Sequence, residues 1–356
     1  MSFRLLITGG AGFVGSSLAL AFKRDHPDWT VVAFDNLKRR GSELALERLR
    51  AGGVEFHHGD VRSAEDLDAA GRANLLIECS AESSVHAGYS GSPHPVMATN
   101  LGGTVNCLEH LRRNGGDLIF LSTSRVYPIA GLRDLPLERR GDRLDLPAAA
   151  SGPGWSSAGI TETFPLTGPR SLYGATKLAS ELLIEEYRAM YGLRAVVDRC
   201  GVIAGPWQMG KVDQGFVVLW MARHLYGGDL DYTGFGGDGL QVRDVLHVDD
   251  LYGLLAEQHR HIDRPAAATY NVGGGVTSSV SLRELTDACQ RLTGNRLPIG
   301  RSPDTRPADV PYYVSDCSAV AAAYGWRPRR GLPVILDDIH RWLRDHRDRL
   351  EPILKN

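Results

Sequence analysis

The apolar residues at the start of the chain change period from strand to helix across a short glycine-rich turn. Residues 4–8, with apolar residues at 5–7, are typical of a short buried strand, and from Val14 onward apolar residues recur at helical spacing. A second apolar run, residues 30–34, ends at Asp35. This order predicts a strand, a helix and a second strand, which is the opening unit of a doubly wound parallel α/β sheet of the Rossmann type.

The glycine-rich turn has the chemistry of a dinucleotide site. Glycine permits positive φ, lets a pyrophosphate approach the backbone, and lets the helix pack closely on its strand. The phosphates would lie on the free N–H groups at the helix N-terminus. Asp35 can accept hydrogen bonds from the adenosine ribose hydroxyls and would repel a 2′-phosphate, which favours NAD over NADP. The predicted cofactor contacts in this unit are Gly9, Gly12, Phe13, Val14, Gly15, Asp35 and Asn36.

Three cations follow in the next loop, Lys38, Arg39 and Arg40. They leave NADP open as an alternative, because lysine and arginine side chains could hold a 2′-phosphate. The favoured interpretation is that they are solvated or touch the adenosine phosphate. NAD therefore remains the predicted cofactor.

Later strands bring further residues to the carboxyl edge of the same predicted sheet, where ligands bind in open α/β folds. The strand 54–57 is followed by Asp60, placed to accept from the adenine amino group, and by Val61 against the ring. The strand 74–79 ends in small residues that suit a cofactor passing over them. The expected contacts there are Ser80, Ala81, Glu82 and, from a helix predicted over 96–113, Asn100.

Two further elements carry candidate catalytic side chains. A strand over 118–121 delivers Thr123 to the sheet edge. A helix predicted over 171–191 carries Tyr173 and Lys177, which are four residues apart and so share one helix face.

The regular strand and helix alternation stops after a strand over 195–200, which predicts two lobes. A chain of 356 residues is long enough for both. We expect residues 1–200 to form the NAD-binding domain and residues 201–356 to form mainly a smaller substrate-binding lobe, interleaved with returns to the main sheet. Residues 129–170 show no sustained periodicity, and we interpret them as a lid beside the substrate, with an ordinary flexible insertion as the alternative.

Bulk composition argues against several classes of function. The net charge is −2, so no general attraction to nucleic acid or membrane is expected. No apolar run approaches the roughly 20 residues that span a bilayer, and the first predicted strand starts directly after Met1, so a cytoplasmic protein without a signal peptide is expected. The five cysteines are dispersed, which predicts neither a metal site nor a disulfide framework.

Nearly the whole chain resembles the extended short-chain dehydrogenase/reductase family of nucleotide-sugar-modifying enzymes. Two segments of the predicted substrate lobe, residues 212–216 with Asp213 and Gln214, and residues 236–247, are most similar to family members that epimerise C2 of a CDP-activated deoxysugar. The other matching motifs are Thr8-Gly-x-x-Gly-x-x-Gly15, Asp35, Asp60-Val61, the Ser122-Thr123 strand end and Tyr173-x-x-x-Lys177.

The resemblance implies roles that these side chains can support. Tyr173 would be the acid/base, accepting a proton from a sugar hydroxyl while the carbon-bound hydride moves to NAD⁺. Because a free phenol has a pKa of about 10, it needs a nearby cation at neutral pH. Lys177 would supply that charge and bind the nicotinamide ribose. Thr123 would hold the reacting oxygen and polarise the carbonyl that forms.

The resemblance also places Arg243 and Arg306 on the nucleotide diphosphate, which guanidinium forks suit well. Either could instead be a surface salt-bridge partner. The predicted substrate contacts are Ser124, Arg125, Gln214, Arg243 and Arg306.

Two departures from the family pattern affect the predicted reaction. Many 4,6-dehydratases of the family carry Asp-Glu directly after the catalytic Thr, whereas this chain has Ser124-Arg125, which disfavours elimination of water. The end of the fourth strand, often His-Leu-Ala-Ala-Gln in relatives, is here the segment 78–82 with Glu at both ends. A divergent member of the family is therefore expected.

We predict an NAD-dependent nucleotide-sugar epimerase that acts through a transient keto sugar, with a CDP-sugar as the favoured substrate. The alternatives within the family are a 4-epimerase, a dehydratase or a decarboxylase acting on a UDP-, GDP- or CDP-sugar. A catalytically silent dinucleotide-binding protein is the alternative from another class. We expect a homodimer or a higher homo-oligomer.

Overall fold

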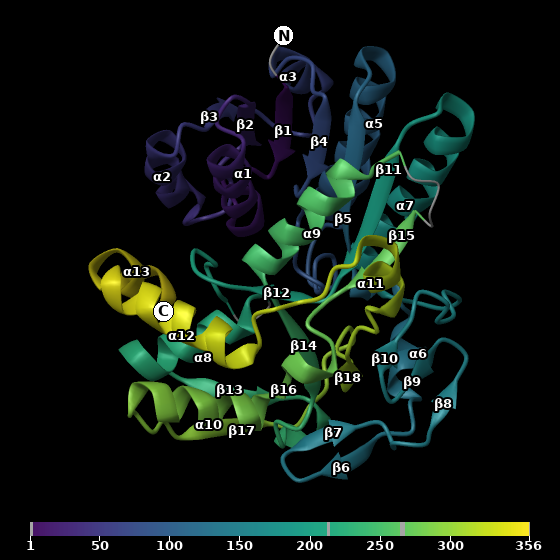
Figure 1. Ribbon diagram of the computed structural model, residues 1–356. Helices are drawn as coiled ribbons and strands as arrows, with labels where there is room; N and C mark the ends of the chain where they lie inside the picture. Colours follow the sequence, from purple (N-terminus) through teal and green to yellow (C-terminus); the bar gives the residue numbers. More distant parts are fainter. Residues whose placement is uncertain (1–2, 212–213, 264–267, 356) are drawn as a thin grey trace.

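The computed structural model describes residues 3–211, 214–263 and 268–355. Seven parallel strands form the main sheet, in the order β15-β11-β5-β4-β1-β2-β3 (Figure 1). This arrangement confirms the predicted doubly wound fold. The strands are β1 (Arg4–Thr8), β2 (Thr30–Asp35), β3 (Glu55–His58), β4 (Leu75–Glu78), β5 (Asp117–Thr123), β11 (Ala195–Cys200) and β15 (Thr269–Val272).

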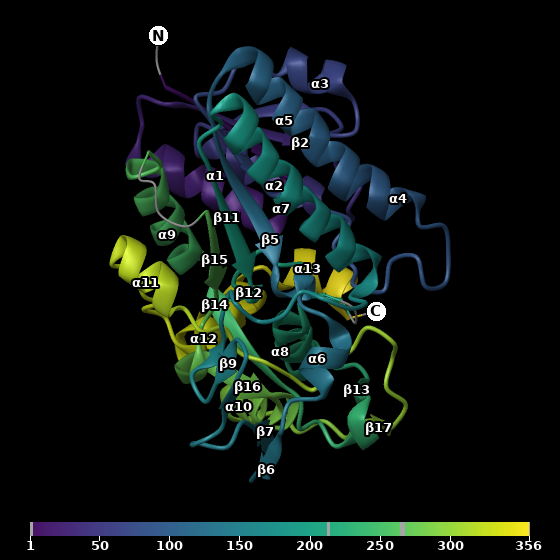
Figure 2. The same cartoon turned by 90° about the vertical axis from the view of Figure 1, so that its right-hand side faces the viewer.

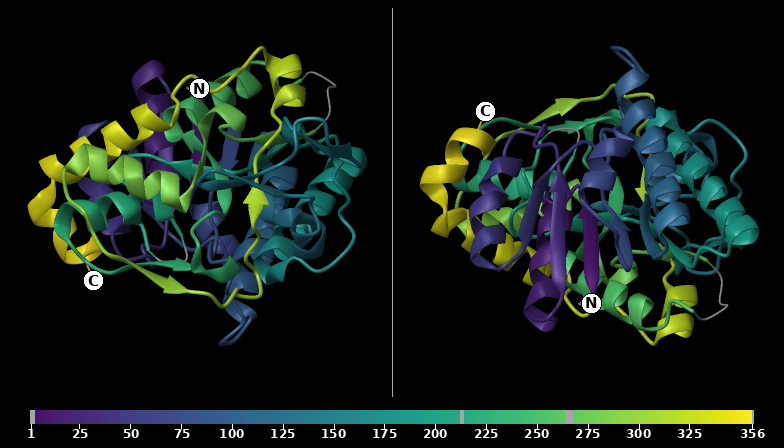
Figure 3. Two further views of the ribbon diagram at one scale, coloured as in Figure 1. Left: turned by 90° about the horizontal axis from the view of Figure 1, so that it is seen from below. Right: turned by 90° about the horizontal axis from the view of Figure 1, so that it is seen from above.

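Helices cover both faces of this sheet, as the two views in Figure 3 show. Strand β1 is buried on both sides, because Leu5 and Ile7 pack into one apolar cluster and Leu6 into the other. Such two-sided burial explains the continuous apolar run in its sequence. One face carries α1 (Phe13–Asp25), α2 (Ala45–Ala51) and α9 (Val248–Arg260), and the other carries α3 (Ala64–Ala69), α5 (Gly103–Asn114) and α7 (Ser171–Tyr191).

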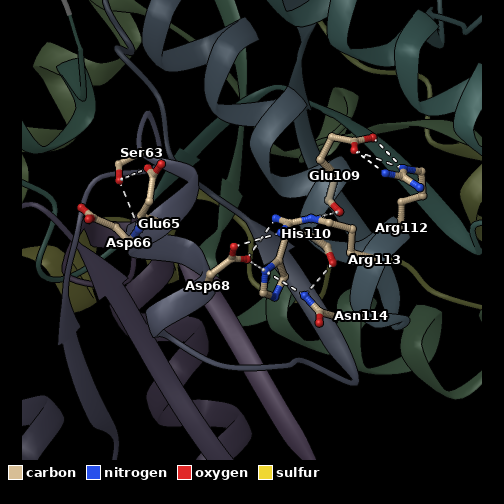
Figure 4. A network of polar contacts seen from close by, with 9 residues as sticks. All are labelled: Ser63, Glu65, Asp66, Asp68, Glu109, His110, Arg112, Arg113 and Asn114. Carbon is tan, nitrogen blue, oxygen red and sulfur yellow. Dashed lines mark hydrogen bonds and ion pairs between the residues drawn. The ribbon is translucent and has the colours of Figure 1, made fainter.

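Surface ion pairs join α3 to α5 beside the sheet (Figure 4). Asp68 of α3 accepts from both terminal nitrogens of Arg113, each at 3.0 Å, and lies 3.1 Å from Nδ1 of His110. The exposed pair between Asp68 and Arg113 contributes little free energy. The apolar cluster beneath them, with Leu67, Leu108 and Leu111, does most to hold the two helices together.

The helix predicted over 96–113 is confirmed, with a local change of period. It starts as α4 (His94–Val96), widens into a π-helical stretch over Met97–Gly102, and continues as α5. π-helical turns free backbone groups for other partners and often mark functional sites. Here the carbonyl of Asn100 accepts from the hydroxyl of Thr104 at 2.8 Å.

The chain after Cys200 builds the second lobe and then returns to the first. Strand β15 pairs with β11 in the main sheet, and α9 packs on α1. The remaining strands of this part are β12 (Val202–Ala204), β13 (Leu230–Thr233), β14 (Val242–His247), β16 (Ser279–Ser281), β17 (Ile299–Ser302) and β18 (Tyr312–Tyr313). Its remaining helices are α8 (Phe216–Tyr226), α10 (Leu282–Thr293), α11 (Ser318–Tyr324), α12 (Leu332–Asp345) and α13 (Arg347–Leu354).

Residues 129–170 form small elements that pack beside the second lobe (Figures 1 and 2). The backbone N–H of Leu144 donates to the carbonyl of Leu240 at 2.9 Å, and that of Ile160 to the carbonyl of Val314 at 2.8 Å. The strands here have only two or three residues, which is too short for a visible periodicity. The elements are α6 (Ile129–Arg133), β6 (Glu138–Arg140), β7 (Arg143–Asp145), β8 (Ser151–Gly152), β9 (Trp155–Ser156) and β10 (Gly159–Ile160).

None of the helices in the described ranges is long and apolar enough to cross a membrane.

Candidate functional site

A cavity of about 790 Å³ lies between the carboxyl edge of the main sheet and the second lobe. Asp60 and Asn100 are the predicted site residues that do not line it. Those that do are Gly9, Gly12, Phe13, Val14, Gly15, Asp35, Asn36, Val61, Ser80, Ala81, Glu82, Thr123, Ser124, Arg125, Tyr173, Lys177, Gln214, Arg243 and Arg306.

The glycine turn at one end of the cavity has the geometry that a pyrophosphate requires. Gly9 has φ +65°, and a Cβ on Gly15 would lie 2.2 Å from the carbonyl oxygen of Gly9. Gly12 precedes α1 and offers no side chain to cap it. The first N–H groups of α1 are therefore left for a ligand, as an anion site at a helix N-terminus needs.

Asp35 faces this turn from the end of β2. Its carboxylate accepts from the N–H of Ala11 at 3.1 Å and from the N–H of Leu37 at 2.8 Å. Burial raises the pKa of Asp35, while these backbone hydrogen bonds act in the opposite direction. Each carboxylate oxygen has a second lone pair, so both can still accept from a ribose hydroxyl.

Asp60 is held by neighbouring side chains instead of facing the cavity. Its two oxygens accept from Nε and Nη2 of Arg62 at 2.9 and 2.6 Å, and Oδ2 also accepts from the Asn36 amide at 2.9 Å. The hydrogen bonds from Arg62 hold the pKa of Asp60 well below its usual range. The predicted contact between Asp60 and adenine therefore has no support here, whereas Val61 lies in the cavity wall.

Asn100 does not line the cavity and holds one of its walls from behind. Its side chain is fully buried, and its amide oxygen accepts from the N–H of Glu82 at 2.8 Å. Its amide nitrogen donates to the carbonyl of Glu82 at 3.2 Å and to the hydroxyl of Thr176 at 3.3 Å. Asn100 thus fixes the loop after β4 against α7, while Ser80, Ala81 and Glu82 themselves line the cavity.

Arg39 joins the cofactor side of the cavity to the second lobe. Its guanidinium donates to the carbonyl of Met209 at 2.9 Å and to the amide oxygen of Gln214. Arg39 and Gln214 are therefore hydrogen-bonded to each other, although the sequence predicts that both are free to contact ligands. Lys38 and Arg40 are exposed. Asp213, in the motif that contains Gln214, lies outside the described residues.

Thr123 and Tyr173 both line the cavity. The Thr123 hydroxyl interacts with the Tyr173 phenol, and Thr123 Oγ1 accepts from the N–H of Arg125 at 3.2 Å. Burial raises the pKa of the Tyr173 phenol, while the Thr123 hydrogen bond and the charge of Arg125 lower it. The pair brings a titratable oxygen and a fixed hydroxyl to one point, which is what acid/base chemistry on a sugar hydroxyl requires.

Lys177 is buried beneath the same wall. Its ammonium donates to the carbonyl of Leu121 at 3.0 Å and lies 4.2 Å from the centroid of the Phe120 ring. Burial lowers the pKa of Lys177, and the carboxyl of Glu78 raises it. Glu78 is itself fully buried and accepts from the hydroxyl of Thr104 at 2.6 Å.

The second-lobe side of the cavity collects positive charge. Burial lowers the pKa of Arg243 to about 9, and its guanidinium donates to the carbonyls of Val242 and Val310 at 2.7 and 2.6 Å. Arg306 donates through Nε to Asp309 at 3.0 Å. Burial alone would raise the pKa of Asp309, but His86, 3.3 Å away, and Arg306 outweigh it and lower the pKa to about 2.

The sequence assigned no role to Asp309, which lines the cavity, or to His86 and Glu78, which do not line it but act on Asp309 and Lys177 respectively. Glu78 could have been suspected, because it ends an otherwise apolar strand, as Asp35 does. His86 and Asp309 are 223 positions apart, and only the fold brings them together.

No described residue of the segment 129–170 lines the cavity. The interpretation of this segment as a lid therefore receives no support from the structure. Within the described residues, no group of histidine, cysteine and acidic side chains is arranged to hold a metal ion.

Comparison with known proteins assigns the chain to the kind of family that its sequence motifs resemble. Residues 5–273 match the model of the NAD dependent epimerase/dehydratase family. The chain is 30% identical to the CDP-paratose 2-epimerase of Salmonella typhi over 345 residues, which cover 92% of this chain and 95% of that protein.

Solved structures agree in fold over nearly the full length. A dTDP-glucose 4,6-dehydratase from Streptomyces venezuelae, determined as a double mutant with NAD bound, superimposes with a TM-score of 0.79 at 28% identity, covering 99% of this chain and all of that one. A UDP-glucose 4-epimerase from Thermus thermophilus in complex with NAD superimposes with a TM-score of 0.76 at 26% identity, covering 96% and 99% of the two chains.

Proposed function

Because the chain belongs to the NAD dependent epimerase/dehydratase family, we propose that it is a redox epimerase of a nucleotide sugar. The relatives that it resembles are enzymes acting on nucleotide sugars. The favoured reaction is inversion at C2 of a CDP-activated deoxysugar, as in CDP-paratose 2-epimerase. The resemblance of the segments 212–216 and 236–247 to that enzyme supports the choice of sugar and base.

One observation carries the choice of epimerisation over elimination. Ser124 and Arg125 follow Thr123 and line the cavity, at the positions where many 4,6-dehydratases carry the acidic pair that removes water. Asp309, which lies near Arg125, is already engaged by His86 and Arg306. A cation beside Tyr173 cannot take a proton from carbon, so the site favours chemistry at the sugar oxygen.

The described residues fit NAD. The uncapped start of α1 suits the pyrophosphate, and Asp35 suits the adenosine ribose. When bound, NAD supplies a hydride acceptor that can also return the hydride. Tyr173 takes the proton of the sugar hydroxyl and gives it back, and Thr123 donates a hydrogen bond to the same oxygen. Lys177 would bind the nicotinamide ribose.

Arg243 and Arg306 would bind the diphosphate of the substrate. Both line the cavity, and both guanidinium groups are already oriented by carbonyl or carboxylate acceptors. Orientation before binding reduces the entropy lost when a ligand is held. Ser124, Arg125 and Gln214 remain proposed contacts to the sugar or nucleotide.

The proposed homodimer would use the outer face of α5 and α7. Large apolar side chains are exposed there, with Leu182 57% and Met190 66% accessible, beside Tyr191 and Val105. Apolar side chains gathered on adjacent helices are typical of a buried interface. Analytical ultracentrifugation of the protein and of Leu182→Glu tests this, since a monomer in both would exclude it.

The proposed function is tested by incubating the purified protein with a panel of CDP-, UDP-, GDP- and dTDP-sugars and analysing the products by NMR. Inversion of one carbon in a CDP-deoxysugar is the expected result. Inversion at C4, loss of water or loss of CO₂ would identify one of the other family reactions. No conversion of any sugar would favour a silent dinucleotide-binding protein.

A further inference from the structure

Arg39 connects three segments that line the cavity. Its Nη2 donates to the carbonyl of Met209 at 2.9 Å, and its Nη1 donates to Ser83 Oγ at 3.3 Å and to the amide oxygen of Gln214. Ser83 follows β4 in the first lobe, whereas Met209 and Gln214 belong to the second lobe. We call these four residues the Arg39 bridge, and all of them line the cavity.

The loop that carries Arg39 is held on both sides of this residue. On one side, the N–H of Leu37 donates to Asp35 Oδ1 at 2.8 Å. On the other side, the N–H of Gly41 donates to the carboxylate of Glu43 at 2.8 Å. Because the loop is already ordered, little entropy is lost when Arg39 forms its contacts with the second lobe.

Two further contacts bring this part of the chain against the second lobe. A Cβ on Gly41 would lie 2.6 Å from Met209 Cγ, so the backbone there packs directly on the methionine side chain. The guanidinium of Arg48, on α2, lies 4.5 Å from the centroid of the Trp207 ring. The two lobes therefore touch at several points on either side of the Arg39 bridge.

Each of the two facing segments contains a bulky residue with a left-handed backbone. Leu37 has φ +54° and Trp207 has φ +72°. Residues of this kind rarely adopt such angles, and they keep them only where the surrounding contacts hold them. Relief of this strain favours separation of the segments once the Arg39 bridge is broken.

The Arg39 bridge lies beside the residues that suit the adenosine half of NAD. Arg39 is four positions after Asp35, whose carboxylate faces the glycine turn, and Ser83 directly follows Glu82 in the cavity wall. NAD bound along the carboxyl edge of the sheet thus lies next to the point where the bridge joins the lobes.

We propose that Arg39 is a positioning residue that holds the second lobe over the adenosine half of NAD, and that NAD leaves only after the Arg39 bridge opens. The inference goes beyond the proposed function, because retention of the cofactor does not depend on which sugar reacts or how. It also gives Arg39 a role other than a solvated cation or a contact to the adenosine phosphate.

Loss of the Arg39 bridge should accelerate the release of NAD. Loss of one hydrogen bond to a charged group changes an equilibrium by about tenfold or more. Arg39→Ala should therefore raise the rate of NAD release by at least about tenfold. Gln214→Ala removes one acceptor from the opposite lobe and should raise this rate by a smaller factor. The double variant should release NAD no faster than Arg39→Ala, because both changes break the same bridge.

The experiment is an exchange of bound NAD in the absence of any sugar. Each variant, loaded with NAD⁺, is diluted into an excess of isotopically labelled NAD⁺, and mass spectrometry of the gel-filtered protein follows the loss of unlabelled cofactor. Because no substrate is added, the result is independent of the proposed epimerisation. If Arg39→Ala is not folded by circular dichroism, Arg39→Gln takes its place.

Arg50→Ala is the matched control, because Arg50 is exposed on α2 and does not line the cavity. It should release NAD at the rate of the unchanged protein. An unchanged rate in Arg39→Ala, or an equal acceleration in Arg50→Ala, would overturn the inference. So would an unchanged rate in Gln214→Ala, or a double variant in which the two factors multiply, because Arg39 would then act on NAD without its partner in the second lobe.

Discussion

The hydroxyl of Thr123, at the end of β5, interacts with the phenol of Tyr173, on the first turn of α7, and lowers its pKa. The two residues are 50 positions apart, and the contact defines where a reacting sugar oxygen would lie. A hydroxyl that donates to a phenolate stabilises it, so Thr123 supports both the base and the oxygen that it deprotonates.

Tyr173→Phe should reduce turnover by roughly 100-fold or more, the usual scale for a positioned acid/base, because it removes only the titrating oxygen. Folding, measured by circular dichroism, and NAD affinity should stay close to the unchanged protein. Lys177→Ala should lose both turnover and NAD affinity. Near-normal turnover of Tyr173→Phe would remove this residue from the mechanism.

The protein should purify with NAD partly bound, since an epimerase that returns its hydride to the same substrate has no need to release the cofactor. Mass spectrometry of the denatured protein measures the bound fraction.

Asp35→Asn keeps one acceptor oxygen for the turn but removes the negative charge, so it should weaken the preference for NAD over NADP. Asp28→Asn, the same change at an exposed position outside the cavity, is the control. Tighter NADP binding in the unchanged protein would show that the cations of this loop outweigh Asp35.

Arg243→Ala and Arg306→Ala should each raise KM much more than they lower kcat, if their contacts to the diphosphate are equal in the ground and transition states. A hydrogen bond to a charged group contributes about 1.5–3 kcal/mol, which is roughly 10- to 150-fold in KM. Steady-state kinetics on the converted nucleotide sugar measures both constants. An unchanged KM in both variants would show that Arg243 and Arg306 have a structural role and do not bind the diphosphate.

Asp198 should make the fold less stable as the pH rises. It is fully buried in β11, where it accepts from the Gln258 amide at 2.7 Å, and burial raises its pKa to about 7. Because the pKa of Asp198 is higher in the folded than in the unfolded protein, its contribution to the free energy of unfolding is largest below about pH 4. This contribution decreases as the pH rises to about 7. The loss amounts to at most about 4 kcal/mol.

Asp198→Asn should therefore stabilise the protein at pH 7.5 and have a much smaller effect at pH 4.5, measured by urea unfolding. Asp28→Asn, at an exposed position, is the control. Equal stability of Asp198→Asn and the unchanged protein at pH 7.5 would show that the buried carboxyl costs nothing.

The parts of the site that sequence could predict are those set by local spacing. The glycines before α1, the residue at the end of β2, and the pair Tyr173 and Lys177 each depend on one element and its turn. Their positions in the cavity follow from the order of the strands.

Asp60 is engaged by a near neighbour, because Arg62, two positions on, donates to both of its oxygens. Long-range partners account for the other features that sequence reasoning missed, since the burial of Asn100 depends on α7 packing against the π-helical stretch. The contact between Arg39 and Met209 joins residues 170 positions apart. Such pairings are decided by tertiary packing, which no local period encodes.

The central claim is that the substrate carbon is inverted by removal and return of a hydride, with Tyr173 acting only on oxygen. Turnover in D₂O, followed by NMR and mass spectrometry of the product, tests it most directly. A hydrogen that leaves carbon as hydride never becomes a free proton, so the ring carbons should contain no deuterium, and a substrate deuterated at the reacting carbon should keep its label. Deuterium at C3 or C5 would contradict the claim, because it requires a base that removes a proton from carbon.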